Sequence, residues 1–322
     1  MMQLGLLTVM FGDKPLKDVL EQIRPLGLNC IELATGNYPG DAHCNLAELL
    51  ASKPKREELK AMVKGEGLFI SALSCHGNCL HPDPKVGKAF QKVQTDTIKL
   101  AGKLGVKNVN DFSGCPGSDE KSTKPNWVTC PWPEDYLEIV NWQWEKKVIP
   151  YWEKQAKFAK DHGVRIGFEM HPGFVVYNTE TLLKLRKACG NNLGANFDPS
   201  HLFWQGMEPI ECVKQLGKQA IFHVHAKDSH AEPRNVAVNG VLDTKHYGAE
   251  ADRAWLFRTC GYGHDAKWWK DFFSTLRVLG YDGPVSIEHE DSLLSNWEGL
   301  TKAVDFLKQA VIFEKPTAIT WA

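Results

Sequence analysis

Short runs of mainly apolar residues alternate with longer amphipathic stretches along this chain of 322 residues. The short runs predict β-strands at residues 4–8, 29–34, 69–73, 106–110, 164–169, 194–198, 221–226 and 284–288. The longer stretches predict helices at residues 16–24, 56–64, 85–103, 134–160, 179–188, 209–216, 267–279 and 293–313. Eight strand–helix repeats favour a parallel sheet, and eight is the number of strands that closes a barrel. We therefore expect an α/β fold, a (β/α)8 TIM barrel, formed by residues 1–322 as a single domain.

Two connections in this pattern are too long for ordinary barrel loops. One covers about residues 111–133 and is rich in Gly, Pro and Ser, and the other covers about residues 228–266. Both follow predicted strands, and the loops that follow the strands of a TIM barrel build its active site. Because long structureless loops in compact domains usually serve as lids or binding loops, we expect both to be active-site loops.

The last four predicted strands end in polar residues that share one face. Side chains alternate between the two faces of a strand, so each apolar set would pack on the helices and each polar set would point into the barrel. The polar pairs are Gly167 with Glu169, Asn196 with Asp198, His223 with His225, and Ser286 with Glu288.

Buried polar residues that converge at one end of a barrel are costly unless something pairs with them, and a divalent cation does so. We expect the metal ligands to be Glu169, Asp198, His225 and Glu288. A single one of these residues is more often a helix cap or a hydrogen-bonded core residue, but their matching register on four strands favours the metal. Three carboxylates and one imidazole suit Mn²⁺ first, with Mg²⁺, Co²⁺ or Zn²⁺ as alternatives. His223 faces the same way as His225, and we interpret it as a neighbour because His225 lies nearer the strand end.

The amino-acid composition limits the classes of partner that we expect for this protein. The formal net charge is −1, and no long run of one charge is present. A nucleic-acid partner is therefore not expected, and a small neutral or weakly charged substrate fits better. The chain has nine cysteines but no CxxC pair, no apolar stretch near the length of a membrane helix, and no signal-peptide pattern at its start. These features predict reduced thiols, a cytoplasmic location and no membrane partner.

The segments GFEMHPGF, NFDPSHLFW, FHVHAKD and GYDGPVSIEHED resemble the xylose isomerase-like TIM barrel superfamily. More narrowly, they resemble the bacterial sugar phosphate isomerase/epimerase group, which is related to tagatose and psicose 3-epimerases and to the catalytic subunits of 3-oxo-glycoside C-deglycosidases. The resemblance spans nearly the whole chain and implies the same four ligands for one divalent cation. It also implies that the metal holds a sugar's carbonyl and neighbouring hydroxyl and stabilises an enediolate.

The resemblance assigns catalytic roles to three residues. Glu169 and Glu288 would lie on opposite sides of the sugar, where one removes a proton beside the carbonyl and the other returns it. Glu290 is a rival for the role of Glu288. His201, in DPSH, would orient the substrate or stabilise charge on oxygen, and a role as a hydrogen-bonding partner of Asp198 is an equal alternative.

Other polar residues are candidates for substrate binding, each with a structural role as the alternative. They follow predicted strands or lie in the second long loop: His76, Asn78, His171, Lys227, Arg258 and His264. Glu32, at the end of the second strand, would contact the substrate or anchor the barrel mouth. The 3-epimerases have an arginine six residues after the ligand histidine, whereas this chain has Ala231. No Gly-rich phosphate loop is present.

Several functions remain open. The first is a sugar isomerase or epimerase. The second is a lyase that cleaves 3-oxo-glycosides, including C-glycosides, by the same proton abstraction, either alone or with a small partner subunit. A DNA-repair endonuclease of the AP-endonuclease type is disfavoured by the charge balance, and a non-catalytic sugar-binding barrel is the fourth reading. A homo-oligomer is also left open.

Overall fold

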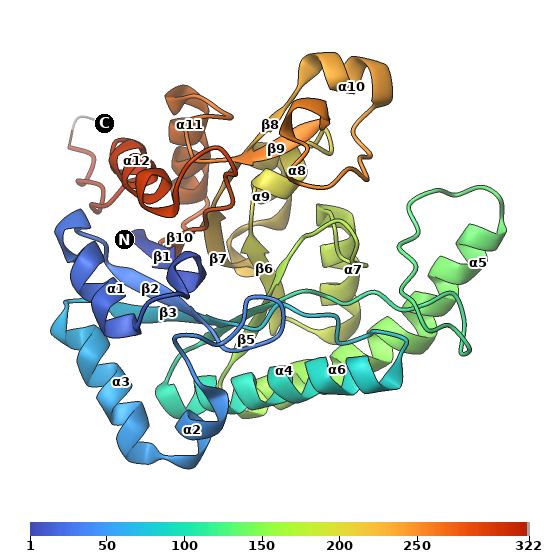
Figure 1. The fold of residues 1–322 in the computed structure, drawn as a ribbon, viewed down its shortest axis with the longest axis horizontal. Coiled ribbons are helices and arrows are strands. Elements are labelled where there is room, and N and C mark those ends of the chain that lie inside the picture. The colour runs from blue at the N-terminus through green and yellow to red at the C-terminus, as the bar shows by residue number, and fades with distance from the viewer. Residues whose placement is uncertain (321–322) are drawn as a thin grey trace.

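The predicted barrel is confirmed by the computed structural model, which describes residues 1–320 (Figure 1). Eight parallel strands close in the order β1-β10-β7-β6-β5-β4-β3-β2. They are β1 (Gln3–Leu7), β2 (Cys30–Ala34), β3 (Phe69–Ser74), β4 (Asn108–Asp111), β5 (Arg165–Glu169), β6 (Leu193–Phe197), β7 (Ile221–Ala226) and β10 (Pro284–Ile287). Each predicted strand overlaps one of these, so the molecule is a single-domain TIM barrel.

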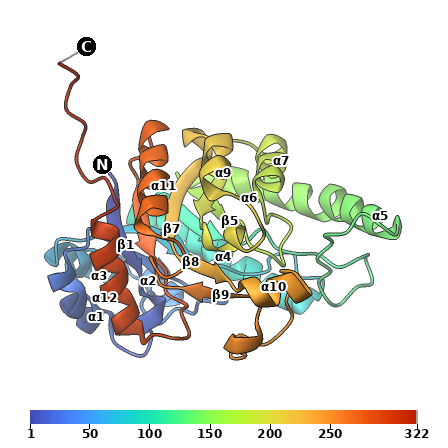
Figure 2. The ribbon, with the colours of Figure 1, turned by 90° about the horizontal axis from the view of Figure 1, so that it is seen from above.

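Helices flank the barrel, and the segment after the last helix runs away from it (Figure 2). The helices are α1 (Leu16–Ile23), α2 (Leu46–Ala51), α3 (Lys53–Gly65), α4 (Pro84–Leu104), α5 (Asp135–Trp142), α6 (Ile149–Asp161), α7 (Thr179–Cys189), α8 (Ser200–Phe203), α9 (Pro209–Leu216), α10 (Pro233–Asn239), α11 (Ala266–Val278) and α12 (Asn296–Lys308). The helix expected at residues 134–160 is divided between α5 and α6 by a π-helical segment, Gln143–Val148. The helix expected at residues 293–313 is shorter than predicted, because Ser295 caps its first turn.

The outward faces of the barrel strands pack on the helices, as the alternation predicts. Phe168 of β5 meets Trp152 of α6 edge-on, with ring centroids 4.5 Å apart. Phe197 of β6 stacks on Phe272 of α11, with centroids 5.8 Å apart. These side chains are fully buried, so the neighbouring polar residues of the same strands must face the barrel interior.

The second long connection is not structureless, contrary to expectation. It forms an antiparallel hairpin of β8 (Asp228–Ala231) and β9 (Trp255–Arg258), in which Asp228 pairs with Arg258. Along the chain, helix α10 lies in the segment that connects these two strands. By contrast, residues 112–134 contain no helix or strand. Both segments leave the carboxyl ends of barrel strands, which is the side that carries active sites in this fold.

Within residues 1–320, no helix combines the length and apolar character needed to cross a membrane.

Candidate metal centre and active site

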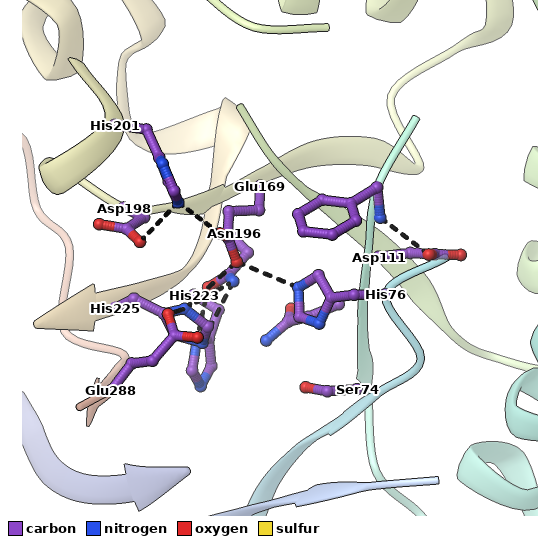
Figure 3. Close-up of polar contacts among 12 residues, drawn as sticks. Ser74, His76, Asp111, Glu169, Asn196, Asp198, His201, His223, His225 and Glu288 are labelled. Atoms are coloured by element: carbon purple, nitrogen blue, oxygen red, sulfur yellow. Dashed lines mark hydrogen bonds and ion pairs between the residues drawn. The ribbon is translucent and has the colours of Figure 1, made fainter. Parts of the chain in front are cut away.

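Four ligand-type side chains converge at the carboxyl ends of four barrel strands. Glu169 ends β5, Asp198 follows β6, His225 lies in β7 and Glu288 follows β10. Each offers one ligand atom, and these atoms all lie within 4.8 Å of one another (Figure 3). This group is the one that strand-end register predicts, and we call it the donor group.

His225 contacts two carboxylates of the donor group. Its Nδ1 atom lies 2.9 Å from Oε2 of Glu288 and 3.4 Å from Oε2 of Glu169. Its Nε2 atom lies 3.0 Å from Oε2 of Glu32. Burial alone would lower the pKa of His225, but Glu32 and Glu288 raise it well above its usual range. The ring is therefore held between carboxylates on both sides.

Three histidines surround the Glu169 carboxylate. Oε1 of Glu169 lies 2.8 Å from Nε2 of His201, and Oε2 lies 3.1 Å from Nε2 of His76. Burial would raise the pKa of Glu169, but hydrogen bonds from His201, His225 and His76 hold it well below 4.5. Glu169 is therefore ionised at neutral pH, as a metal ligand or a base must be.

Two buried carboxylate oxygens support a cation at this place. Oδ2 of Asp198 and Oε2 of Glu288 accept no well-aligned hydrogen bond among the described residues, although His201 and His225 lie 3.3 and 2.9 Å from them. Burial and the nearby carboxylates raise the pKa of Asp198 to about 6, although His201 and Lys227 oppose the shift. A positive ion would satisfy both oxygens and relieve the repulsion between the carboxylates, so three carboxylates and one imidazole fit a divalent cation.

A layer of buried polar side chains lies next to the donor group, inside the barrel. Glu32 is inaccessible to solvent and accepts hydrogen bonds from Ser74 and, at 2.7 Å, from Nδ2 of Asn110. His223 lies 2.9 Å from Oδ1 of Asn196 and 3.3 Å from the Ser71 hydroxyl. His223 is thus outside the donor group, and burial lowers its pKa to about 4. Glu32 anchors His225 rather than lining the cavity.

Lys227 is a buried cation beside the donor group. Its Nζ lies 3.4 Å from Oε2 of Glu288 and 3.8 Å from Oδ2 of Asp198, and it also pairs with Glu290. Burial would lower the pKa of Lys227, but these carboxylates raise it well above its usual value. Glu290 is half exposed and is not a member of the donor group, which distinguishes it from Glu288.

A cavity of about 660 Å³ opens above the donor group. Glu169, Glu288 and Lys227 line its polar part. Among the predicted substrate-binding residues, His76 and His171 also line it, and their rings lie against the same phenylalanine, Phe112. A substrate in this cavity would touch the candidate base and the buried lysine together.

The other three predicted substrate-binding residues do not line the cavity. Asn78 holds the backbone of Cys115 through two hydrogen bonds. Arg258 pairs with Asp291 at 3.1 Å, and His264 pairs with Asp228 at 2.7 Å. These contacts give Asn78, Arg258 and His264 structural partners in the loops around the cavity.

The apolar lining of the cavity was not predicted from the sequence. Tyr38, Phe112 and Phe174 come from loops after β2, β4 and β5, while Tyr247 and Phe257 come from the β8–β9 insertion. No spacing along the chain links these rings. Only the position of the first three shortly after barrel strands could have pointed to the cavity.

The closed parallel barrel, with ligand-type side chains gathered at the carboxyl ends of its strands, places the chain among TIM-barrel proteins. Residues 20–310 match the xylose isomerase-like TIM barrel family, and the chain belongs to it. It is 42% identical over 313 residues to the uncharacterized protein YfiH of Bacillus subtilis, across 96% of this chain and 99% of that protein. It is 31% identical over 286 residues to the rhizopine catabolism protein MocC of Rhizobium meliloti, across 87% of this chain and 76% of that protein.

An inosose dehydratase of Clostridium botulinum is 31% identical over 159 residues, which is 48% of this chain and 51% of that protein. Two solved structures share the fold. A D-tagatose 3-epimerase-like protein has a TM-score of 0.62 at 21% identity, over 95% of this chain and 97% of that chain. The IOLI protein with a bound zinc atom has a TM-score of 0.63 at 20% identity, over 96% and 98%.

Proposed function

We propose that this protein is a divalent-metal-dependent sugar isomerase or epimerase that removes a proton from the carbon beside a carbonyl. The observation that carries the proposal is the donor group, in which Glu169 and Glu288 approach His225 from different strands at the floor of the cavity. The names of the epimerase-like structure and of the inosose dehydratase support chemistry on sugars and related polyols, and both reactions can begin with removal of a proton beside a carbonyl.

Glu169, Asp198, His225 and Glu288 would hold the cation, with Mn²⁺ as our first choice and Mg²⁺, Co²⁺ or Zn²⁺ as alternatives. The zinc atom in the IOLI protein supports the last of these. A bound divalent cation would polarise the substrate's carbonyl oxygen and so acidify the neighbouring C–H bond.

The chain's own residues would move the proton. The pKa of Glu288 is about 2, because Lys227 and His225 outweigh burial and the repulsion of Glu169, and the pKa of Glu169 is also low. Both carboxylates are therefore ionised, so one can accept a proton from carbon and the other, once protonated, can return one. His201 is held by Glu169 and Asp198 and would orient the substrate, while Lys227 would stabilise negative charge that develops on oxygen.

A second outcome of the same proton removal is elimination. A 3-oxo-glycoside that loses its C2 proton can expel the group at C1, which leaves with the bonding electrons as C1 and C2 become doubly bonded. The apolar lining of the cavity favours this candidate, since a sugar alone offers little for it to bind. Such a lyase would act on a glycoside, with or without a small partner subunit.

Deuterium exchange tests the shared step. The Mn²⁺-loaded protein would be incubated in D₂O with free ketoses and with 3-oxo-glucose, and label at carbon would be followed by NMR. We expect label beside the carbonyl of at least one compound, and interconverted sugars then identify the epimerase. If calorimetry shows bound Mn²⁺ and no compound in the panel exchanges, the proposal is refuted.

A cytoplasmic location, a homo-oligomer and the absence of nucleic-acid and membrane partners remain predictions. All nine cysteines are free thiols, which supports a reducing compartment.

A further inference from the structure

The cavity has apolar walls on two sides. The loop wall consists of Tyr38, Phe112 and Phe174, and the hairpin wall consists of Tyr247, Leu256 and Phe257. Three further apolar side chains, at the end of β1 and just after it, also line the cavity: Leu7, Val9 and Met10.

The loop wall continues directly from the candidate active site. Phe112 stacks on Phe174 with ring centroids 4.3 Å apart. The Phe112 ring also lies 4.7 Å from the rings of both His76 and His171. Because His76 contacts Glu169, an apolar group on this wall would lie one residue away from the candidate base.

The hairpin wall reaches the same residues from the other side. Phe257 meets His201 edge-on at 5.3 Å, and Nζ of Lys227 lies 4.1 Å from its ring centroid. Tyr247 stacks on Phe257 with centroids 5.9 Å apart. The two walls are joined through His171 and His201, whose rings are 4.1 Å apart.

The charged groups are concentrated at the floor and on one edge of the cavity, whereas the walls offer only histidine rings and the hydroxyls of Tyr38 and Tyr247 as hydrogen-bonding groups. Glu169, Glu288 and Lys227 lie at the floor, and Glu290 and Ser292 lie on the exposed edge. A sugar has hydroxyl groups around its whole ring, and burying them against aliphatic and phenyl side chains would leave them without partners. The walls therefore suit a different part of the ligand.

We infer that the natural substrate is a polar, carbonyl-bearing ring with an apolar substituent of about the size of a six-membered ring, which packs between the loop wall and the hairpin wall. This inference rests on the proposed function, because it places the carbonyl end at the donor group. A bare sugar could stack one face on a single aromatic ring, but it would not use both walls and the aliphatic residues.

Two probe glycosides that differ only in the apolar group test the inference: methyl and cyclohexyl 3-oxo-β-D-glucopyranoside. Their leaving groups are both simple alcohols, so their chemistry is matched. Dissociation constants would be measured by calorimetry with the Mn²⁺-loaded protein, and C2 deuterium exchange by NMR. We expect the cyclohexyl compound to bind about tenfold more tightly or better, as burial of a ring of this size implies.

Variants of residues on the two walls test where the cyclohexyl group binds. Tyr38→Ala and Tyr247→Ala remove half-exposed rings from opposite walls, and each should lower the cyclohexyl-to-methyl affinity ratio several-fold. Tyr136→Ala on α5 removes an exposed ring outside the cavity and should leave the ratio unchanged.

The outcomes separate the two proposals. Equal binding of the two glycosides, or no binding of either, overturns the inference. Preferred binding of the cyclohexyl compound without exchange at carbon in either glycoside or in the free sugars refutes the proposed function but leaves the inference intact. Deuterium exchange in both glycosides, with equal affinity for the two, overturns the inference and supports the proposed function.

Discussion

Glu32 and His225 form a buried ion pair inside the barrel, with Oε2 of Glu32 lying 3.0 Å from Nε2 of His225. Both side chains are inaccessible to solvent. The opposite ring nitrogen of His225 faces Glu288 at 2.9 Å. A histidine whose second nitrogen is held by a carboxylate has a fixed tautomer and orientation, which is the usual arrangement behind a metal ligand.

Replacing Glu32 with glutamine should weaken metal binding. The neutral amide keeps the shape of the side chain but loses the charge that orients the imidazole. We expect about a 10- to 100-fold lower Mn²⁺ affinity by calorimetry. Glu66→Gln, which removes a carboxylate that pairs with Arg24 far from the donor group, is the control and should bind Mn²⁺ normally. An unchanged affinity in Glu32→Gln would mean that the ion pair does not position the ligand.

The two glutamates of the donor group should behave differently from Glu290. We expect Glu169→Gln and Glu288→Gln each to reduce deuterium exchange at carbon by about 10²- to 10⁴-fold, since general base catalysis contributes that much. Glu290→Gln should retain exchange within several-fold, because Glu290 is half exposed and pairs with Lys227 from outside the group. NMR exchange rates at saturating Mn²⁺ provide the measurement. A larger loss of deuterium exchange in Glu290→Gln than in Glu288→Gln would mean that Glu290, and not Glu288, acts in proton transfer.

Metal binding should stabilise the fold, and Asp198 should be required for this. A ligand that binds only the folded state adds about 2.7 kcal/mol at a concentration one hundred times its Kd. We therefore expect Mn²⁺ to raise the melting temperature of EDTA-treated protein, and Asp198→Asn to lose most of that rise. Thermal unfolding followed by circular dichroism measures both. An equal rise in the melting temperature of Asp198→Asn on adding Mn²⁺ would show that Asp198 is not a metal ligand.

The stability of the fold should also depend on pH through Asp111, a buried residue outside the donor group. Burial raises its pKa to about 7, against hydrogen bonds from Gln94, Phe112 and Gly77. The folded pKa lies above the unfolded value of 3.8, so the stability that protonated Asp111 contributes is lost as pH rises through about 7. Asp111→Asn, which stays neutral, should gain about 2–4 kcal/mol of stability relative to the parent between pH 4 and pH 8, apart from a pH-independent loss of the hydrogen bond from Gln94.

Urea unfolding of the EDTA-treated proteins tests this difference at several pH values. The advantage of Asp111→Asn should shrink as pH falls from 8 towards 4, where the parent carboxyl is protonated in both states. Asp282→Asn changes an exposed carboxylate and should show no such trend. A constant difference across this range would contradict the raised pKa.

The barrel and the donor group were predictable because both follow from local pattern and one geometric rule. Each barrel strand is a short apolar run followed by a helical stretch. The carboxyl ends of parallel strands meet at one end of a barrel, so Glu169, Asp198, His225 and Glu288 converge whatever the loops do.

The remaining features depend on pairings that no local pattern records. Glu32 meets His225 across 193 positions of the chain. The hairpin strands are four residues each, and the β8 sequence DSHA has too few apolar residues to suggest a strand. Arg258 was expected over the substrate, but its charge is taken by Asp291, which lies 33 positions later.

Asp228 should control the order of the loop that joins the hairpin to α11. Its Oδ2 atom accepts backbone N–H groups from Gly261, Gly263 and His264, at 3.1, 3.1 and 2.9 Å. The other oxygen, Oδ1, accepts the N–H of Ser229 and lies 2.7 Å from Nδ1 of His264. An asparagine has only one accepting oxygen, so Asp228→Asn must leave one of these two sets of contacts without its acceptor. We expect a loss of about 2–4 kcal/mol in the free energy of unfolding. Amide hydrogen exchange at residues 261–264 should become faster.

Asp265→Asn is the matched control in the same loop. Asp265 caps α11 by accepting the N–H of Trp268, and asparagine caps helices equally well, so stability should change by less than about 0.5 kcal/mol. Because the loop borders the β8–β9 insertion that carries Phe257, Asp228→Asn should also weaken cyclohexyl glycoside binding more than methyl glycoside binding. Equal exchange protection of residues 261–264 in Asp228→Asn and Asp265→Asn would show that the carboxylate does not hold this loop.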